Sequence, residues 1–376
     1  MSQSYLKPVV AIVVGAIIIG AIFMLESRKA DQGSNTILKE QDIVIKDESE
    51  RVAQKAKEFE RAKEISSPDG FINTDGVTVE EFVGEKIILV DFWTYSCINC
   101  QRTLPYLNDW HEKYGDKGLV ILGVHTPEFD FEKDYQNVQR AVEKYDIKYP
   151  VVLDNDFSTW RSYKNQYWPR KYLIDIDGFI VYDHIGEGSY EETEKKIVEL
   201  LNERSHVLGE QMVELDTSLP EGVDNVDFSQ VRSPEMYFGS TRIEYLRNLP
   251  EEKCLTESCA YTSGGPLQVN TFQLSGTWKI GDEHAQLESG SGSIFLGFYA
   301  NKVNLVAGSD LPVRAEIYLD GEKVGDFGGR DVNGSAVTFK EEDLYNVVDL
   351  GGAYGQHLLE IRILDGGLSA FAFTFG

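Results

Sequence analysis

Cys97 and Cys100 are the residues of this sequence best suited to chemistry, because they form a Cys-Ile-Asn-Cys motif at the end of an apolar stretch. The segment 87–93 is short, mostly apolar and rich in branched side chains, which indicates a buried strand. The motif should begin the helix that follows. The unpaired N–H groups and the dipole of a helix N-terminus favour an anion such as a Cys97 thiolate. Cys100 lies one helical turn further on the same face, so it can attack a mixed disulfide formed at Cys97. The spacing predicts thiol–disulfide exchange, with Cys97 as the nucleophile and Cys100 as the resolving cysteine.

The other two cysteines, Cys254 and Cys259, are also close in the sequence. A structural disulfide that closes this small loop is one interpretation. A second redox pair fed by Cys100 and Cys97 is the other, because so short a ring gains little loop-closure entropy. Cys97 and Cys100 could themselves form a structural disulfide or half of a zinc site, but no second ligand pair lies at the usual spacing. We therefore expect no metal, and no cofactor beyond a redox-active disulfide between Cys97 and Cys100.

The segments around the motif resemble a known family. The string VDFWTYSCINC, followed by TLP, resembles thioredoxin, and four later segments are similar to the extracytoplasmic DipZ/TlpA-like branch of that family, in the redoxin superfamily: GVHTPEFDFEKD, YPVVLDND, NQYWPRKYLID and GEGSYEETEKKI. The resemblance covers roughly residues 68–202. It implies an α/β thioredoxin fold, with a central mixed sheet flanked by helices, and an oxidoreductase that acts on protein disulfides and dithiols.

Two further residues take their expected roles from this resemblance. Asp91 lies six residues before Cys97, where thioredoxins keep a buried acid that manages the proton of the resolving thiol. A solvated acid at a strand edge is the alternative, although an acid in an apolar strand is costly without a partner or a role. Pro169, which follows Trp168, matches the cis-proline that faces the cysteines and lets the substrate backbone dock. It could instead be an ordinary residue at the start of a strand.

Four aromatic or polar residues are weaker candidates. His125 and Glu128 follow the predicted strand 119–124, at the end where an α/β sheet presents its ligands. They could tune the cysteines or contact a partner, or they could only stabilise the loop. Trp93 and Trp168 could form an apolar rim where a substrate docks, or they could belong to the core.

The length of 376 residues predicts two folded domains, and the composition constrains their partners. The net charge of −26 argues against binding to nucleic acid, which requires basic patches. Shifts in composition divide the chain into five segments: 1–29, a signal anchor; 30–67, a charged helical stalk or linker; 68–203, the thioredoxin-like domain; 204–232, a linker; and 233–376, an all-β domain.

Residues 8–25 are uncharged and apolar, and as a helix they would extend about 27 Å, nearly the thickness of a hydrocarbon core. The segment ends without the small residues of a cleavage site, so we expect an uncleaved transmembrane helix rather than a cleaved signal peptide. The protein is then a single-pass protein of the cell membrane. Because the redox chemistry suits an oxidising compartment, we expect its soluble domains on the extracytoplasmic side.

Residues 233–376 contain many short segments of alternating polarity separated by Gly and Asp. This pattern predicts a β-sandwich of jelly-roll type. SPEMYFGSTR, LSGTW and the terminal FAFTFG are similar to the C-terminal domain that follows DipZ-type thioredoxins, whose fold resembles carbohydrate-binding modules. A glycan is therefore one conceivable ligand, and Trp278 could stack on a sugar or belong to the core.

Together these features predict a membrane-anchored extracytoplasmic enzyme that reduces disulfides of envelope proteins. The resemblance implies an electron donor of the CcdA/DsbD type, which would be a separate membrane protein because this chain has one predicted span. A thiol peroxidase is an alternative, since Thr94 lies three residues before Cys97, although Val90 stands where peroxiredoxins have proline. A scaffold that binds envelope glycan or protein through the C-terminal domain is another.

Overall fold

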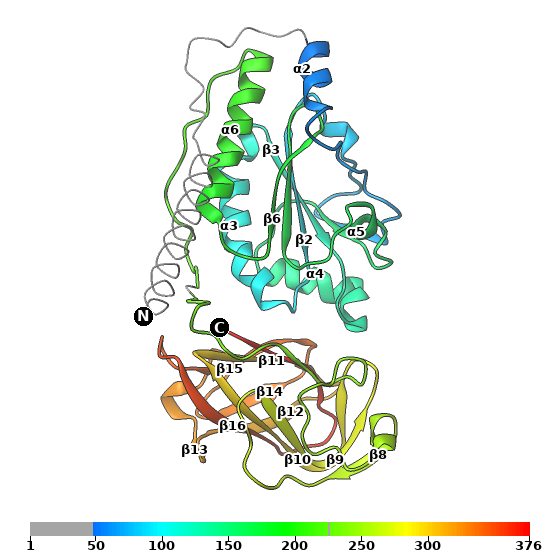
Figure 1. Cartoon of the computed structure of the whole chain (residues 1–376), viewed down its shortest axis with the longest axis vertical. Helices are drawn as coiled ribbons and strands as arrows, with labels where there is room; N and C mark the ends of the chain where they lie inside the picture. The colour runs from blue at the N-terminus through cyan, green and yellow to red at the C-terminus, as the bar shows by residue number, and fades with distance from the viewer. Residues whose placement is uncertain (1–47, 225) are drawn as a thin grey trace, which may run out of the picture. The chain divides into compact units, whose positions relative to one another are not determined.

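The computed structural model describes residues 48–224 and 226–376 (Figure 1). The predicted transmembrane helix, residues 8–25, lies outside these ranges, as does the first part of the predicted stalk. Within the described ranges, no helix is both long enough and apolar enough to cross a membrane. Residues 52–376 form one compact unit, which contains the cysteine motif.

The first half of this unit is built on a six-stranded mixed sheet in the order β1-β4-β3-β2-β5-β6. Strands β2, β3 and β4 are parallel, whereas β1, β5 and β6 pair antiparallel with their neighbours. Central strand β2 is buried at every position, which explains its nearly continuous apolar sequence. The strands are β1 (Gly70–Ile72), β2 (Ile87–Trp93), β3 (Leu119–His125), β4 (Val151–Leu153), β5 (Arg170–Ile174) and β6 (Ile180–Ile185).

Helices cover both faces of this sheet (Figure 1). Ile87, Leu89 and Trp93 of β2 pack on the side of α3, α4 and α6, while Val90 and Phe92 pack on the side of α5. This alternation is the period of a strand, and it directs residue 91 toward the side of α3. The helices are α2 (Glu48–Lys55), α3 (Ile98–Tyr114), α4 (Tyr135–Lys144), α5 (Ser158–Ser162) and α6 (Tyr190–Leu208), with short 3₁₀ turns η1 (Glu80–Phe82), η2 (Gly115–Lys117) and η3 (Asp130–Lys133).

The predicted thioredoxin-like fold with a mixed sheet is confirmed, with two differences in detail. Strand β1, which has three residues, was not predicted. Helix α6 continues to Leu208, beyond the predicted start of the linker at residue 204.

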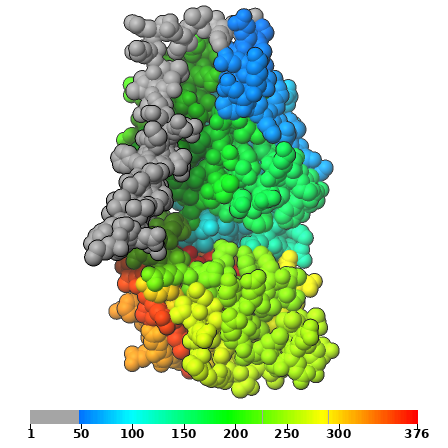
Figure 2. Space-filling view, in the orientation of Figure 1, coloured from blue at the N-terminus to red at the C-terminus, as the bar shows by residue number. Residues whose placement is uncertain are grey.

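The second half of the unit is all-β, and its strands are hydrogen-bonded into one eleven-stranded sheet. A large apolar cluster fills the interior of this curled sheet, and yellow-green residues that precede β9 form much of its visible surface in Figure 2. The strands are β7 (Met236–Tyr237), β8 (Ser258–Tyr261), β9 (Thr271–Ile280), β10 (Ala285–Ala300), β11 (Lys302–Gly308), β12 (Val313–Leu319), β13 (Glu322–Lys323), β14 (Ala336–Phe339), β15 (Asp343–Asp349), β16 (Gly355–Ile363) and β17 (Ser369–Phe375), with 3₁₀ turns η4 (Glu252–Leu255) and η5 (Gly325–Phe327).

The all-β class agrees with the prediction, but the two separate sheets of a jelly-roll sandwich are not found among the described strands. The reason lies in β10, whose first residues pair with β17 and whose later residues pair with β16. Its register with β9 shifts between Leu287 and Ser293. Such an irregularity bends a strand, so one long strand serves both parts of the sheet and joins them.

Candidate active site

The cysteine motif lies where β2 passes into α3. Cys97 is the N-cap residue of α3, and its sulfur accepts a hydrogen bond from the backbone N–H of Cys100, with a donor–acceptor distance of 3.4 Å. Both residues are free thiols; Cys97 is partly exposed and Cys100 is buried. Burial and the neighbouring Cys97 sulfur raise the pKa of the Cys100 thiol well above its usual value. A substrate can therefore reach Cys97, while Cys100 keeps its proton until a base accepts it.

Asp91 is the buried acid on the same side of the sheet. Its side chain is 1% exposed, and its Oδ1 has no hydrogen-bond partner among the described residues. Burial raises the pKa of Asp91 to about 7, against the opposing effect of the positive charge on Lys171. The negative charge of Asp91 in turn helps to raise the pKa of Cys100. The alternative of a solvated edge acid is wrong, since β2 is a central strand.

Lys171 is a site residue that sequence reasoning missed. It lies directly opposite Asp91 in the antiparallel β2–β5 pair and is fully buried. Its Nζ donates to the carbonyl oxygen of Gly186 at 3.2 Å. Burial lowers the pKa of Lys171, while Asp91 and Cys100 act to raise it. A lysine two residues after Pro169, followed directly by Tyr172, Leu173 and Ile174, was the available signal.

The Trp168–Pro169 peptide is cis, as the sequence predicts, and Pro169 leads into β5 beside β2. Trp168 is half-buried and donates its Nε1–H to the carbonyl oxygen of Thr126 at 3.0 Å. Trp168 and Cys97 both pack at the edge of the core beneath α3. These positions are compatible with the predicted docking role, which stays a prediction.

Trp93 and His125 lie in the core instead of at a rim. Trp93 is fully buried, so of the two interpretations that the sequence left open, the position in the core fits. The ring of His125 is also buried, with its centroid 5.1 Å from that of Trp93 and 5.8 Å from that of Tyr95. Burial lowers the pKa of His125 to about 3, so the ring is neutral at physiological pH. Its contacts support the turn that carries Cys97, including Thr94 Oγ1 at 3.4 Å from Nε2.

Glu128 points toward the C-terminal half of the chain. Its Oε1 accepts hydrogen bonds from the hydroxyl of Tyr237 at 2.9 Å and from Nη1 of Arg242 at 2.6 Å. These two hydrogen-bond partners of Glu128 lie within the same chain, and its contact with a partner protein stays a prediction. Loop stabilisation, the other interpretation of this residue, also fits these bonds.

Glu132 is a second residue that sequence reasoning missed. Its carboxylate is fully buried and accepts hydrogen bonds from the N–H and hydroxyl of Ser96 at 3.2 and 2.7 Å, and from the N–H groups of Glu128 and Phe129 at 2.6 and 3.0 Å. Ser96 immediately precedes Cys97. Glu132 therefore fixes the turn that presents the nucleophile.

An ion pair holds the residues between the cysteines. Arg102 donates through Nε and Nη2 to both carboxylate oxygens of Glu187, at 2.8 and 2.7 Å, and the same Nη2 donates to Asn99 Oδ1 at 2.8 Å. Bidentate pairs of this kind fix geometry as well as charge. The loop with Glu187 thereby secures the first turn of α3.

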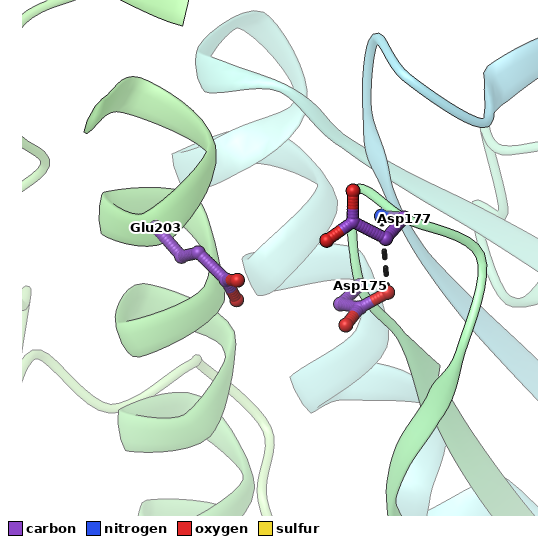
Figure 3. A group of neighbouring side chains, drawn as sticks. All are labelled: Asp175, Asp177 and Glu203. Atoms are coloured by element: carbon purple, nitrogen blue, oxygen red, sulfur yellow. Dashed lines mark hydrogen bonds between the residues drawn. The ribbon is translucent and has the colours of Figure 1, made fainter. Parts of the chain in front are cut away.

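Three carboxylates gather elsewhere in this domain, as Figure 3 shows: Asp175, Asp177 and Glu203. The ammonium group of Lys55 lies 2.6, 2.9 and 2.5 Å from their oxygens. Burial acts to lower the pKa of Lys55, but the hydrogen bonds of Lys55 to the carboxylates outweigh this effect and raise the pKa. Asp175 also accepts the N–H of Asp177 at 3.0 Å within the turn between β5 and β6. The cluster is therefore an ion-paired turn.

Cys254 and Cys259 form a disulfide, as both interpretations of this pair require. Cys254 is buried in the core of the curled sheet, and Cys259 pairs with Trp278 between β8 and β9. Trp278 is fully buried, and its Nε1–H donates to the carbonyl oxygen of Ser275 at 2.9 Å. It is therefore a core residue and does not offer a surface for a sugar ring.

Known proteins share both halves of this arrangement. Residues 52–183 match the AhpC/TSA family, and residues 233–376 match the family described as thioredoxin like C-terminal domain. Protein DipZ of Mycobacterium tuberculosis is 32% identical over 319 residues, which are 84% of this chain and 43% of DipZ. This chain is a thioredoxin-like protein related to DipZ. It spans less than half the length of DipZ.

Smaller relatives match the thioredoxin-like half. Thiol-disulfide oxidoreductase YkuV of Bacillus subtilis is 29% identical over 140 residues, 37% of this chain and 93% of YkuV. Among solved structures, a thioredoxin-like protein in the oxidized form is 28% identical, covers 39% of this chain and 97% of its own, and has a TM-score of 0.36. The site and the similarity in sequence to DipZ and YkuV support an oxidoreductase of the thiol–disulfide class.

Proposed function

We propose that this protein is a membrane-anchored thiol–disulfide oxidoreductase that reduces disulfides of extracytoplasmic proteins. The observation that carries the proposal is the pairing of a partly exposed Cys97, at the N-terminus of α3, with a buried Cys100. The buried Asp91 on the same side of the sheet adds a base. An exposed nucleophile, a protected resolving thiol and a proton acceptor are the parts that disulfide reduction requires.

The reaction has two steps. The Cys97 thiolate attacks one sulfur of the substrate disulfide, the substrate S–S bond breaks, and the other substrate sulfur leaves as a thiolate that takes up a proton. Cys100 then loses its proton to the Asp91 carboxylate and attacks the Cys97 sulfur. This step releases the second substrate sulfur as a thiolate, which takes up a proton, and it leaves a Cys97–Cys100 disulfide, so that two electrons have passed to the substrate.

The hydrogen bond from Cys100 N–H to the Cys97 sulfur favours negative charge on Cys97 before the attack on the substrate disulfide. Lys171, beside Asp91, stabilises the carboxylate form that accepts the proton. The second step therefore depends on protein groups that lie on β2, β5 and α3. These groups stay in place when the substrate leaves.

The location and the electron donor are inferred from the sequence. Residues 8–25 are apolar enough for an anchor, and four cysteines in two close pairs suit an oxidising compartment. A reductase in such a compartment needs a source of electrons, and a CcdA/DsbD-like membrane dithiol protein would supply them. Glycan binding is not part of the proposal, because Trp278 is buried.

A redox titration of the purified protein tests the direction of electron flow. A two-electron potential near that of thioredoxin, about −270 mV, is expected for a reductase, whereas a potential near about −120 mV would contradict it and indicate an oxidase. A peroxidase is distinguished by hydrogen peroxide consumption. Consumption that survives Cys100→Ser but not Cys97→Ser would favour the peroxidase over the proposal.

A further inference from the structure

One face of the active-site helix is covered by the C-terminal half of the chain. Ile98, Gln101 and Arg102 have the spacing i, i+3 and i+4, so they share a face at the start of α3. They are only 7%, 7% and 5% exposed, although two of them are polar. This face begins at Ile98, the first of the two residues between the cysteines. Whatever covers it also borders Cys97.

The cover at Ile98 is apolar. Ile98 belongs to a buried cluster that includes Phe129 of the thioredoxin-like half and four residues of the curled sheet: Val306, Leu344, Phe371 and Ala372. The ring of Phe371 also packs edge-on against Phe129 and Phe131, with centroids 5.3 and 4.7 Å apart. The side chain between the cysteines is thus anchored in an intramolecular hydrophobic contact.

Polar contacts surround this cluster. Arg330 Nη2 donates to Gln101 Oε1 at 3.1 Å, and the hydroxyl of Tyr95, two residues before Cys97, donates to the carbonyl oxygen of Glu342 at 3.1 Å. The guanidinium of Arg102 lies over the ring of Phe228 at 5.5 Å. The covered area therefore extends along both the turn before Cys97 and the first turns of α3.

Ion pairs form the outer edge of the contact. Lys144 Nζ lies 2.5 Å from Asp343 Oδ2, and Arg140 Nη2 lies 3.4 Å from Glu341 Oε2. All four side chains are partly exposed, between 24% and 48%. They can be changed without disturbing either core.

We propose that the C-terminal domain is a selectivity wall that restricts Cys97 to disulfides in extended or locally unfolded segments. The inference rests on the proposed function and names its substrate class. A mixed disulfide brings the partner's backbone to within several ångströms of Cys97, since the two Cα atoms of a disulfide are about 6 Å apart. A folded partner that buries about 800 Å² of each surface would overlap the area held by Leu344 and Phe371. An extended segment needs only the exposed surface of Cys97 and of Tyr167 and Trp168, of which Tyr167 is 47% exposed.

Charge reversal at the edge of the wall tests this inference. Glu341→Lys with Asp343→Lys places like charges against Arg140 and Lys144 and should loosen the contact. The matched control adds Arg140→Glu and Lys144→Glu, which restores attraction with the signs exchanged. Leu344→Ala is a second variant that weakens the same contact from its apolar side.

The readout is the second-order rate constant for oxidation of the reduced full-length protein by two probes. One is a flexible peptide with a single disulfide, and the other is folded insulin. The reversal and Leu344→Ala should each raise the rate with insulin about fivefold and change the rate with the peptide less than twofold. The control should restore the original ratio of the two rates. An unchanged insulin rate in both loosened variants, or an equal rise for both probes, would overturn the wall. Loss of the peptide reaction in the unaltered protein would instead refute the proposed function.

Discussion

Asp91 and Lys171 face each other across the central β2–β5 pair, both buried, beside the resolving thiol of Cys100. The positive charge of Lys171 acts to lower the pKa of Asp91, but burial has the larger effect and raises this pKa to about 7. The balance of these two effects places the pKa of the proton acceptor near neutral pH. It also makes the proton transfer sensitive to each partner separately.

Lys171→Met should shift the pH profile of the resolving step to higher pH. Without the lysine charge, burial raises the pKa of Asp91 further, so the carboxylate that accepts the Cys100 proton forms only at higher pH, by on the order of one unit. The measurement is the pH dependence of the rate at which Cys100 releases a small thiol from Cys97. Lys171→Arg keeps the charge and should keep the profile. Coincident profiles for the Met variant and the unaltered protein would contradict the pairing.

Asp91→Asn should stabilise the protein at high pH. The folded-state pKa of Asp91, about 7, lies above the unfolded value of 3.8, so the folded protein binds this proton more tightly. The resulting stabilisation is complete below about pH 3.8 and is lost as the pH rises to about 7. The gain in the free energy of unfolding caused by Asn should therefore grow from pH 4 to pH 8, on the order of 4 kcal/mol. Urea unfolding at several pH values gives the comparison, and parallel curves would argue against a raised pKa.

Glu132→Ala should destabilise the turn that carries Cys97. It leaves the N–H and hydroxyl of Ser96 and two backbone N–H groups without their acceptor, at a cost of about 2–4 kcal/mol. Glu143→Ala, on the exposed surface of α4, is a matched control that should change stability by less than about 0.5 kcal/mol. Urea unfolding measures both. Equal effects of the two substitutions would mean that the buried carboxylate does not hold the turn.

Arg102 and Glu187 should behave as one unit. Arg102→Met leaves a partly buried carboxylate unpaired and Glu187→Gln leaves a buried guanidinium charge unpaired, so each should lower the free energy of unfolding by about 3 kcal/mol. The double variant should lose clearly less than the sum of the two, because neither charge is then left alone. A double-mutant cycle by chemical denaturation provides the coupling energy. Simple additivity would show that the ion pair contributes little.

The local parts of the site could be predicted from the sequence, while the pairings between distant segments could not. The strand before Cys97, the helix after it and the proline at 169 each have a signal within a few residues. Lys171 is 80 positions from Asp91, and Glu187 is 85 from Arg102, so only the folded sheet shows that they meet.

The sequence also could not predict which side chains near the motif are buried. Trp93 and Trp168 are both aromatic residues near the motif, and only the packing distinguishes the first as core and the second as partly exposed. The contact of Ile98 with Leu344 was equally invisible, because an apolar residue between two cysteines is compatible with exposure to a partner. The single curled sheet follows from one shift in β10 that leaves no clear mark in an alternating pattern.

Trapping a mixed disulfide at Cys97 is the most direct test of thiol–disulfide exchange. The Cys100→Ser protein is reduced and mixed with a dimer of a one-cysteine peptide that is linked by a disulfide. It should gain the mass of one peptide and keep it, because no resolving thiol remains, and it should lose that mass with dithiothreitol. Cys97→Ser, whose buried Cys100 is shielded, should gain none. A folded Cys100→Ser protein that forms no adduct, or equal adducts on both variants, would contradict the assignment of Cys97 as the nucleophile.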